Sequence, residues 1–355
     1  MKQFRDNEVL PLYQRRGHQH RRRHRGQLLL LTIVAAVILV LWHETRKTSA
    51  LEQGTVPNEH ATAVGRGGRY ATTAPRVKGV RHLIVVAGHA VLRSLREKGD
   101  SFEENAAWHL ERYQEVVPNQ ASTFVQHARM GVAAAAKDPE ALLLFSGGAT
   151  KLLSPLTEAQ SYWLVSEANM WFAGTRPSET DLHVPDNPGS KVGQNQAAQS
   201  VRERSFTENF ARDSFENVLF SICRFHELTG RYPDRITVVS YEFKRRRFED
   251  LHRKAMRIPA PRFAFTGSGF PREALEKAVA GEAKVFEAFE QDPYGMHGIL
   301  RSKVTSRDPF NQGAGHYANS CEEIQGLMQH EGPAPYVGRL PWVEDAGDTD
   351  ISFEG

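Results

Sequence analysis

The sequence predicts an α/β protein with a Rossmann-like parallel sheet and flanking helices, plus one N-terminal transmembrane helix. Short apolar runs of strand length, at 82–87, 141–145 and 235–240, alternate with stretches of helical periodicity. That alternation is typical of a buried parallel sheet. A separate run at 28–42 is apolar except for Thr32 and follows a block of arginines, which predicts the membrane helix.

The charge of the chain is concentrated at its N-terminus. Residues 1–27 contain eight Lys or Arg and two Asp or Glu, whereas all 355 residues together carry a net charge of +3. The remainder is therefore slightly acidic, and the pI of 8.8 gives no reason to expect nucleic acid as a partner. The chain has only two cysteines, Cys223 and Cys321, so it has no cysteine-rich zinc cluster. The sequence is compatible with one disulfide between them or with two free thiols.

The apolar run predicts a signal anchor. We expect residues 1–27 to form a basic cytosolic tail and 28–43 to cross the membrane, because the basic side of a span stays in the cytosol. The chain would then be a single-pass type II membrane protein of the secretory pathway, and a span this short suits the thin membrane of the endoplasmic reticulum or Golgi. A cleaved signal peptide is the alternative, but no small-x-small site follows closely.

After the span, we expect a flexible stalk at 44–79, the α/β domain at 80–340 and an acidic tail at 341–355. The domain elements follow from capping signals, apolar periodicity and glycine stops. Besides the three strands, they are a helix from Ser101 to about Val117, a helix at 122–137, a helix from Thr157 to about Phe172, a loop at 174–200, a helix at 207–229, a helix opened by Lys244–Arg247, a strand at 262–265, and helices at 271–290 and 320–330.

Ligands of such sheets bind beyond the carboxyl ends of the strands, which directs attention to the residues that follow each strand. Gly88 follows the first strand, and Ser146, Gly147 and Gly148 follow the second. A strand that ends in two glycines lets backbone N–H groups approach a ligand closely. A tight turn from strand to helix explains the same glycines without a ligand.

A polar ridge is predicted on the helix at 207–229. Asn209, Asp213, Glu216 and Asn217 fall at i, i+4, i+7 and i+8, so they share one helix face. The rest of the helix is apolar and should be buried, and polar groups on a buried helix need partners. An ordinary solvated first turn is the simpler interpretation.

The basic run Lys244–Arg247 opens a helix, where cations are disfavoured by about 0.3–1 kcal/mol each. One charge-assisted hydrogen bond contributes about 1.5–3 kcal/mol, so one or two contacts with a carboxylate or a bound anion would offset the cost. Asp213 or Glu216 could supply the carboxylate. We also expect one or two of these cations to point into water.

Further carboxylates near the predicted site are Glu167 and Glu203, each a candidate metal ligand or general base and each also explained as solvated surface. Among the histidines, His89 is the one placed for a site, directly after the first strand. No His-x-Glu or His-Glu-x-x-His pattern occurs, so we predict no metal site, and the sequence indicates no particular cofactor.

The order of these motifs resembles the domain of unknown function 218 family, the SanA/YdcF-like proteins. The resemblance covers about residues 80–270 and implies a Rossmann-like fold, often with one N-terminal membrane helix and, in bacteria, a link to envelope biogenesis. Lys244 stands where many members have His, and Asp213-Ser214 where many have Ser or Thr, which suggests a fungal branch without His-based acid/base chemistry. The positions that match the family pattern are Gly147, Gly148, Glu167, Glu216, Asn217 and Arg247.

These patterns together predict a membrane-anchored domain that binds an anionic ligand of nucleotide or phosphosugar type. Gly88, Ser146, Gly147, Gly148, Asn217, Lys244 and Arg247 are the expected ligand-binding residues. Glu167, Asp213 and Glu216 are the expected catalytic residues of a hydrolase or transferase in envelope, glycan or lipid metabolism. A non-catalytic binding or assembly factor, held together by a structural Arg–carboxylate network, is the alternative. No protein partner is indicated.

Overall fold

The computed structural model describes residues 77–93, 101–172, 200–313 and 315–343. They belong to one compact unit, Thr73–Gly355. The predicted membrane span at 28–43 and nearly all of the predicted stalk and of the loop at 174–200 lie outside the described residues. Within the described residues, no helix is both long enough and apolar enough to span a bilayer.

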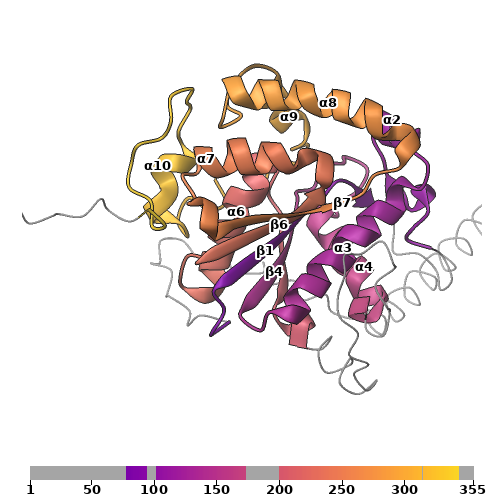
Figure 1. Cartoon of the computed structure of the whole chain (residues 1–355), viewed down its shortest axis with the longest axis horizontal. Helices are drawn as coiled ribbons and strands as arrows, with labels where there is room; N and C mark the ends of the chain where they lie inside the picture. The colour runs from indigo at the N-terminus through magenta and orange to yellow at the C-terminus, as the bar shows by residue number, and fades with distance from the viewer. Residues whose placement is uncertain (1–76, 94–100, 173–199, 314, 344–355) are drawn as a thin grey trace, which may run out of the picture. The chain divides into compact units, whose positions relative to one another are not determined.

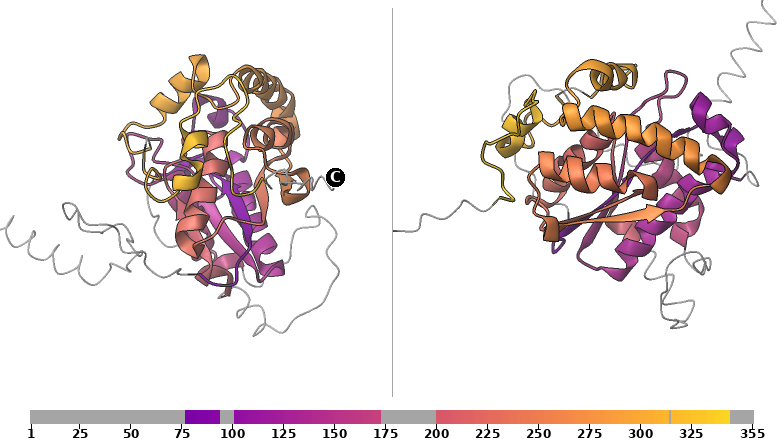
Figure 2. Two further views of the ribbon diagram at one scale, coloured as in Figure 1. Left: turned by 90° about the vertical axis from the view of Figure 1, so that its left-hand side faces the viewer. Right: turned by 45° about the horizontal axis from the view of Figure 1, so that its top comes forward.

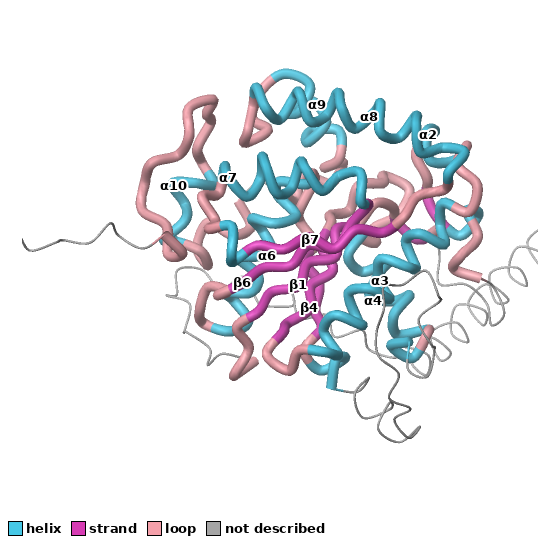
Figure 3. Tube along the Cα trace, viewed as in Figure 1, coloured by secondary structure: helices cyan, strands magenta, loops and turns pink. Residues whose placement is uncertain are grey.

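A sheet of five parallel strands forms the centre of the described domain, in the order β5-β4-β1-β6-β7 (Figures 1 and 3). The strands are β1 (His82–Ala87), β4 (Ala141–Ser146), β5 (Ser205–Glu208), β6 (Arg235–Tyr241) and β7 (Phe263–Ser268). The first strand, β1, lies in the middle of the sheet. The next two strands, β4 and β5, are added on one side of β1, and β6 and β7 are added on the other side. The carboxyl ends of β1 and β6 therefore flank the point where the winding reverses, and the predicted α/β class is confirmed.

Helices cover both faces of the sheet. On one face, α3 (Gln120–Lys137) and α4 (Glu158–Ala168) pack on β1 and β4, and on the other lies α6 (Ser214–Thr229). The side chains of β1 alternate between the two cores: Leu83 joins the α6 side and Ile84 joins the α3 side. Burial on both faces explains why these strands read as continuous apolar runs.

The segment after β6 is helical, as predicted, but irregular. It consists of a 3₁₀ turn (Glu242–Lys244), a π-helical stretch (Arg247–His252) and the short α7 (Arg253–Ala255). π-Helical turns often occur at functional sites because they reposition side chains relative to a regular helix.

The predicted helix from Ser101 to about Val117 is wrong. The chain instead forms a 3₁₀ turn (Asn105–Ala107), the short strand β3 (Trp108–His109), which pairs with β2 (Val91–Leu92), and the single turn α2 (Arg112–Glu115). The fully buried indole of Trp108 donates its N–H to the Phe102 carbonyl and holds the segment extended. Tertiary burial thus overrides the local helix signal.

The predicted helix at 207–229 begins seven residues too early. Its first residues belong to β5, where Glu208 pairs with Ser146, and α6 starts only at Ser214. Asp213 is the N-cap, and its carboxylate accepts a hydrogen bond from the N–H of Glu216. Asn209, Asp213, Glu216 and Asn217 therefore do not form a ridge on one helix.

Two further helices follow β7 and extend over the α6 side of the sheet. The long α8 (Arg272–Gln291) was predicted, whereas α9 (Gly298–Ser306) was not. Figure 2 shows α8 outside the helical segment that follows β6, on the same side of the sheet. The helix predicted at 320–330 is shorter, with a 3₁₀ turn (Glu322–Ile324) and α10 (Gln325–Met328).

The two cysteines form a disulfide. Cys223 of α6 is bonded to Cys321, just before α10, and both residues are fully buried. The bond ties the C-terminal segment to the central helix of this face. The sequence is compatible with either a disulfide or two free thiols, and the structure contains the disulfide.

Candidate functional site

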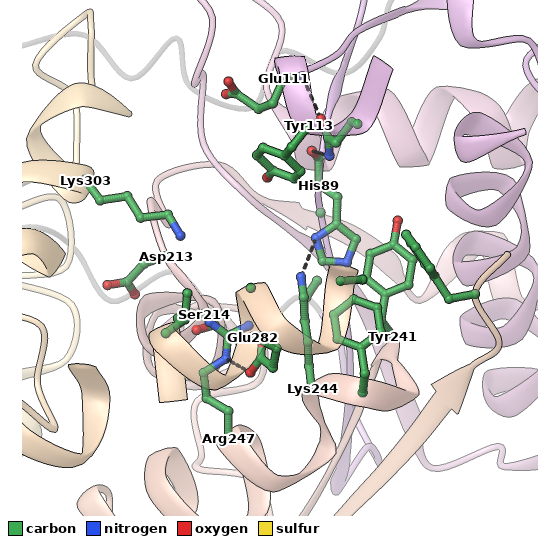
Figure 4. A pocket seen from close by; sticks show the side chains of 18 of the residues that line it. His89, Glu111, Tyr113, Asp213, Ser214, Tyr241, Lys244, Arg247, Glu282 and Lys303 are labelled. Atoms are coloured by element: carbon green, nitrogen blue, oxygen red, sulfur yellow. Dashed lines mark hydrogen bonds and ion pairs between the residues drawn. The ribbon is translucent and has the colours of Figure 1, made fainter. Parts of the chain in front are cut away.

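A cleft of about 920 Å³ opens at the carboxyl ends of β1 and β6 (Figure 4). Gly88 and His89 follow β1 into it, and Tyr241 and Lys244 enter it from the end of β6. The opposite wall comes from α8, α9 and the following residues up to Arg307, which we call the roof. The cleft thus lies at the reversal of the sheet, where open α/β sheets bind ligands.

Seven Lys or Arg side chains line the cleft: Arg212, Lys244, Arg247, Lys277, Lys284, Lys303 and Arg307. Lys277 and Lys284 of α8 are exposed, and Arg212 is paired with Glu216 and Asp308. Of the remaining four, Lys244, Arg247, Lys303 and Arg307, only Arg247 forms an ion pair within the part of the chain that the structure describes. Burial, together with Arg307 and Arg247, lowers the pKa of Lys303 to about 8. The cations therefore repel one another in a partly desolvated space.

Arg247 lies deepest of the four, with its side chain 5% exposed. Its Nε is 3.0 Å from Oε1 of Glu282 on α8, but neither atom has a well-directed hydrogen bond to any residue that the structure describes. The guanidinium also faces the ring of Phe289, whose centroid is 5.9 Å away. Glu282 therefore compensates the charge of Arg247 and leaves hydrogen-bonding capacity unused.

The basic run divides in two directions. Arg245 pairs with Glu242 and Glu249, and the exposed Arg246 pairs with Asp250. Lys244 and Arg247 point into the cleft instead (Figure 4). Two of the four cations are thus ordinary surface charges, as the sequence analysis expects, and the other two face the candidate site.

His89 has a defined set of contacts at the base of the cleft. Its ring stacks on Tyr241 with centroids 4.7 Å apart, and its Nε2 lies 3.1 Å from Oγ of Ser240. Its Nδ1 lies 3.5 Å from Nζ of Lys244. Burial, followed by the charge of Lys244, holds the pKa of His89 well below its usual range, so its imidazole is neutral.

A second histidine, His252, contacts Ser214, which lines the cleft. Oγ of Ser214, the first residue of α6, lies 2.8 Å from Nε2 of His252. His252 is fully buried against the rings of Phe248 and Phe289. Among the described residues its Nδ1 has no hydrogen-bond partner, and burial holds its pKa well below the usual range.

Five acidic side chains also line the cleft: Glu111, Glu158, Asp213, Glu273 and Glu282. Three have a defined partner: Glu111 pairs with Lys151, Glu158 accepts a hydrogen bond from the hydroxyl of Thr150, and Glu282 pairs with Arg247. Asp213 caps α6, and burial raises its pKa. In Figure 4 its carboxylate lies on the same side of the cleft as Lys303.

The structure brings together only part of the residue set predicted from sequence. Gly88, Asp213, Asn217, Lys244 and Arg247 line the cleft, whereas Ser146, Gly147, Gly148, Glu167 and Glu216 do not. Glu282, Lys303 and Arg307 of the roof also line the cleft but were not predicted from sequence. Lys303 and Arg307 are four residues apart on and just beyond α9, but no local signal relates them to a site on a distant strand.

The two glycines after β4 serve the turn. The N–H of Gly147 donates to the carbonyl of Glu208, and that of Gly148 donates to the carbonyl of Ala211. Gly147 has a φ of 150°, and a Cβ at this position would lie 2.8 Å from Cβ of Glu158. Gly147 is therefore needed for a close approach to α4, and the N–H groups of both glycines are occupied within the fold.

Glu216 and Glu167 are both engaged in ion pairs outside the cleft. Glu216 accepts two hydrogen bonds from the guanidinium of Arg212, which also contacts Asp308. Burial raises the pKa of Glu216 to about 7. Glu167 pairs with Arg202 near the end of α4, where both side chains are about 40% exposed.

A buried polar network lies under the floor of the cleft. Oγ of Ser146 is 2.6 Å from Oε2 of Glu208 and 3.0 Å from Oδ1 of Asn217. A hydroxyl has one proton and cannot donate to both acceptors. Burial raises the pKa of Glu208 to about 7, and a protonated Glu208 resolves the conflict because it donates to Ser146, which then donates to Asn217.

Among the described residues, no group of three or more His, Cys, Asp or Glu side chains is arranged to hold a metal ion. The chain matches no protein-family model and no solved structure. It is similar to a protein of Saccharomyces cerevisiae described as uncharacterized protein YOR238W, with 27% identity over 283 residues. The match covers 70% of this chain and 92% of the yeast protein. The resemblance to the domain of unknown function 218 family stays a prediction.

Proposed function

We propose that the chain is a membrane-anchored protein whose cleft binds an anionic small molecule, of nucleotide or phosphosugar type. The observation that carries the proposal is the meeting of Lys244, Arg247, Lys303 and Arg307 at one cleft. They come from two separate segments of the chain, and Glu282 is the only carboxylate that forms an ion pair with any of them within the described residues.

The energetics favour an anion as the missing partner. Arg247, Lys303 and Arg307 repel one another in a partly desolvated space, and burial, followed by the charges of Arg307 and Arg247, lowers the pKa of Lys303 to about 8. A phosphate placed among them would relieve it and accept charge-assisted hydrogen bonds, which are about twice as strong as neutral ones. The planar guanidinium of Arg247 is suited to a bidentate contact with such a group.

A hydrolase or transferase is the catalytic form of this proposal. Two groups beside the cations could move protons: the buried carboxyl of Asp213 and the neutral imidazole of His89. Glu167 and Glu216, which were predicted as catalytic together with Asp213, form ion pairs with Arg202 and Arg212. The proposal of a hydrolase or transferase therefore rests on Asp213.

Two features support the proposed compartment. The apolar run at 28–43 is proposed to anchor the chain as a type II membrane protein of the endoplasmic reticulum or Golgi, with the α/β domain in the lumen. Disulfides persist in oxidising compartments, and the buried Cys223–Cys321 bond supports that placement.

A non-catalytic binding or assembly factor is the second candidate, and one observation favours it. Arg212, Glu216 and Asp308 form an internal ion-pair network that joins the start of α6 to the segment after α9. Such a network can hold the roof in place without any reaction. In this case the cleft is a recognition site or a structural feature only.

Thermal shifts of the full-length protein in detergent test anion binding. The panel contains inorganic phosphate, nucleoside diphosphates, nucleotide sugars and sugar phosphates, applied to the wild type and to Lys303→Ala. Lys303 is half-buried, so the variant should fold. Lys277→Ala is the matched control, because Lys277 lines the same cleft from an exposed position on α8.

We expect at least one phosphorylated compound to stabilise the wild type and Lys277→Ala but to stabilise Lys303→Ala far less. No stabilisation by any compound, with all variants well folded, would refute anion binding and favour the assembly factor.

A further inference from the structure

Lys244 occupies a position that differs from that of the other cations in the cleft. Its Nζ lies 5.0 Å from the centroid of the Tyr241 ring and 6.0 Å from that of Phe243. Nδ1 of His89, at 3.5 Å, is its one polar side-chain contact within the described residues. Figure 4 shows the amine pointing into the cleft beside His89. The amine is therefore held by aromatic rings and an imidazole, with no ion pair.

This environment favours the uncharged form of the amine. Burial, followed by the charge of Arg247, holds the pKa of Lys244 well below its usual range. A lysine that lacks a counter-charge and lies next to other cations is a better nucleophile, because more of it carries a free lone pair at neutral pH.

His89 is placed to take up a proton from this amine. If Nε2 of His89 carries its hydrogen and donates to Ser240, then Nδ1 presents a lone pair to Nζ of Lys244. The neutral imidazole is stacked on Tyr241, which fixes the plane of the ring. The pair thus combines an amine with an adjacent proton acceptor inside a cleft large enough for a small substrate.

We propose that Lys244 is a nucleophile that forms an imine with the carbonyl group of an anionic aldehyde or 2-oxo acid bound in the cleft. The choice of an anionic substrate rests on the function proposed above: Lys303 and Arg307 of the roof, with Arg247, would hold the carboxylate or phosphate. Lys244 would be left free to react, because three other cations supply the charge.

The step balances without an oxidant or reductant. The lone pair of Nζ forms a bond to the carbonyl carbon as the C=O π bond breaks, and His89 Nδ1 takes one proton from the nitrogen and passes it to the oxygen, which gives a neutral carbinolamine. His89 Nδ1 then takes the second proton from the nitrogen and passes it to the hydroxyl as the C–O bond breaks. Water leaves and the C=N bond forms, so one amine and one carbonyl yield one imine and one water.

Reductive trapping tests this assignment directly. The full-length protein is incubated at pH 7 with sodium cyanoborohydride and either glyoxylate, an anionic aldehyde, or formaldehyde, a neutral one. Peptide mapping by mass spectrometry then compares adducts at Lys244 with those at Lys277, which lines the same cleft from an exposed position. Lys244→Arg and Lys277→Arg are the matched variants, and inorganic phosphate is added as a competitor.

We expect both aldehydes to label Lys244 at least about ten times faster than Lys277, since labelling follows the free-base fraction of the amine. Phosphate should slow labelling by glyoxylate, and Lys244→Arg should abolish the major adduct while Lys277→Arg keeps it. Equal labelling of the two lysines by both aldehydes would overturn the proposal. Fast labelling of Lys244 with no preference for glyoxylate and no effect of phosphate would support the nucleophile and refute the anion site.

Discussion

Arg247 and Glu282 join the wall of the cleft to its roof, with Nε of the arginine 3.0 Å from Oε1 of the glutamate. The glutamate side chain is only 10% exposed, and the hydrogen bonding of both atoms is incomplete. The carboxylate of Glu282 therefore lies where an oxygen of a bound anion would be expected. A ligand that binds Arg247 must share it with Glu282 or displace the carboxylate.

The variant Glu282→Gln separates these roles. The change keeps the size of the side chain but leaves the charge of Arg247 uncompensated. We expect the free energy of unfolding to fall by about 3 kcal/mol, as when one partner of a buried ion pair is removed. Because an added anion would restore the balance, phosphate should stabilise this variant more than the wild type in urea unfolding.

Glu273→Gln is the matched control for that experiment. Glu273 lines the cleft from the first turn of the same helix but is exposed, so its loss should change neither stability nor the response to phosphate. If Glu282→Gln behaved like Glu273→Gln, Glu282 would not be the counter-charge of Arg247.

The raised pKa of Glu208, about 7, gives the stability of the fold a defined dependence on pH. The same carboxyl in an unfolded chain has a pKa of about 4.3. Between these values the folded protein holds a proton that the unfolded chain has released, so stability falls as pH rises from about 4.5 to 7. The loss from Glu208 is about 4 kcal/mol, with no further change above about pH 8.

Glu208→Gln should remove this part of the pH dependence. The amide can donate to Ser146, as the protonated carboxyl does, so the network under the cleft is kept. Glu216 has a pKa of about 7 as well, so part of the slope will remain in the variant. Urea unfolding at a series of pH values measures the effect, and an unchanged slope would show that Glu208 is ionised in the folded protein.

Asp213 and Glu167, both predicted as catalytic, should differ in the effect of a conservative substitution. Asparagine is a good N-cap, so Asp213→Asn should preserve α6. It removes a negative charge from the cleft, and we therefore expect phosphate to bind several-fold more tightly, whereas any turnover that uses this carboxyl would be lost. Isothermal titration with phosphate measures the first effect.

Glu167→Gln should change neither binding nor turnover. Its ion pair with Arg202 is about 40% exposed and lies outside the cleft, so the cost to stability is at most about 1 kcal/mol. A loss of ligand binding in Glu167→Gln but not in Asp213→Asn would reverse the assignment of the site.

The strands that are buried in the interior of the sheet were predicted correctly from the sequence, whereas the short strands and the edge strand β5 were not. Strands β1, β4 and β6 lie in the interior of the sheet and are mostly apolar and buried, so their sequence alone identifies them. In contrast, β5 is a short edge strand with the sequence Ser-Phe-Thr-Glu, and the two-residue strands β2 and β3 are too short for any periodicity. These elements are set by their tertiary partners, which the sequence does not display.

The sequence predicts those parts of the site that follow from the order of the strands and from helical spacing. The ends of β1 and β6 must lie together in this topology, which places His89 near Lys244. Helical spacing also accounts for the division of the basic run, since Lys244 and Arg247 are three residues apart and face the same way. No such rule places Glu282 opposite Arg247, because that contact depends on how α8 packs over a different segment.

The roof has a further consequence for how related proteins could diverge. The three roof residues that face the basic run in the cleft, Glu282, Lys303 and Arg307, come from one continuous stretch that follows the last strand. The strands and their connections supply the other half of the cleft and could stay as they are. Replacement of that single stretch by another sequence would change the ligand preference of the cleft while the sheet stays the same.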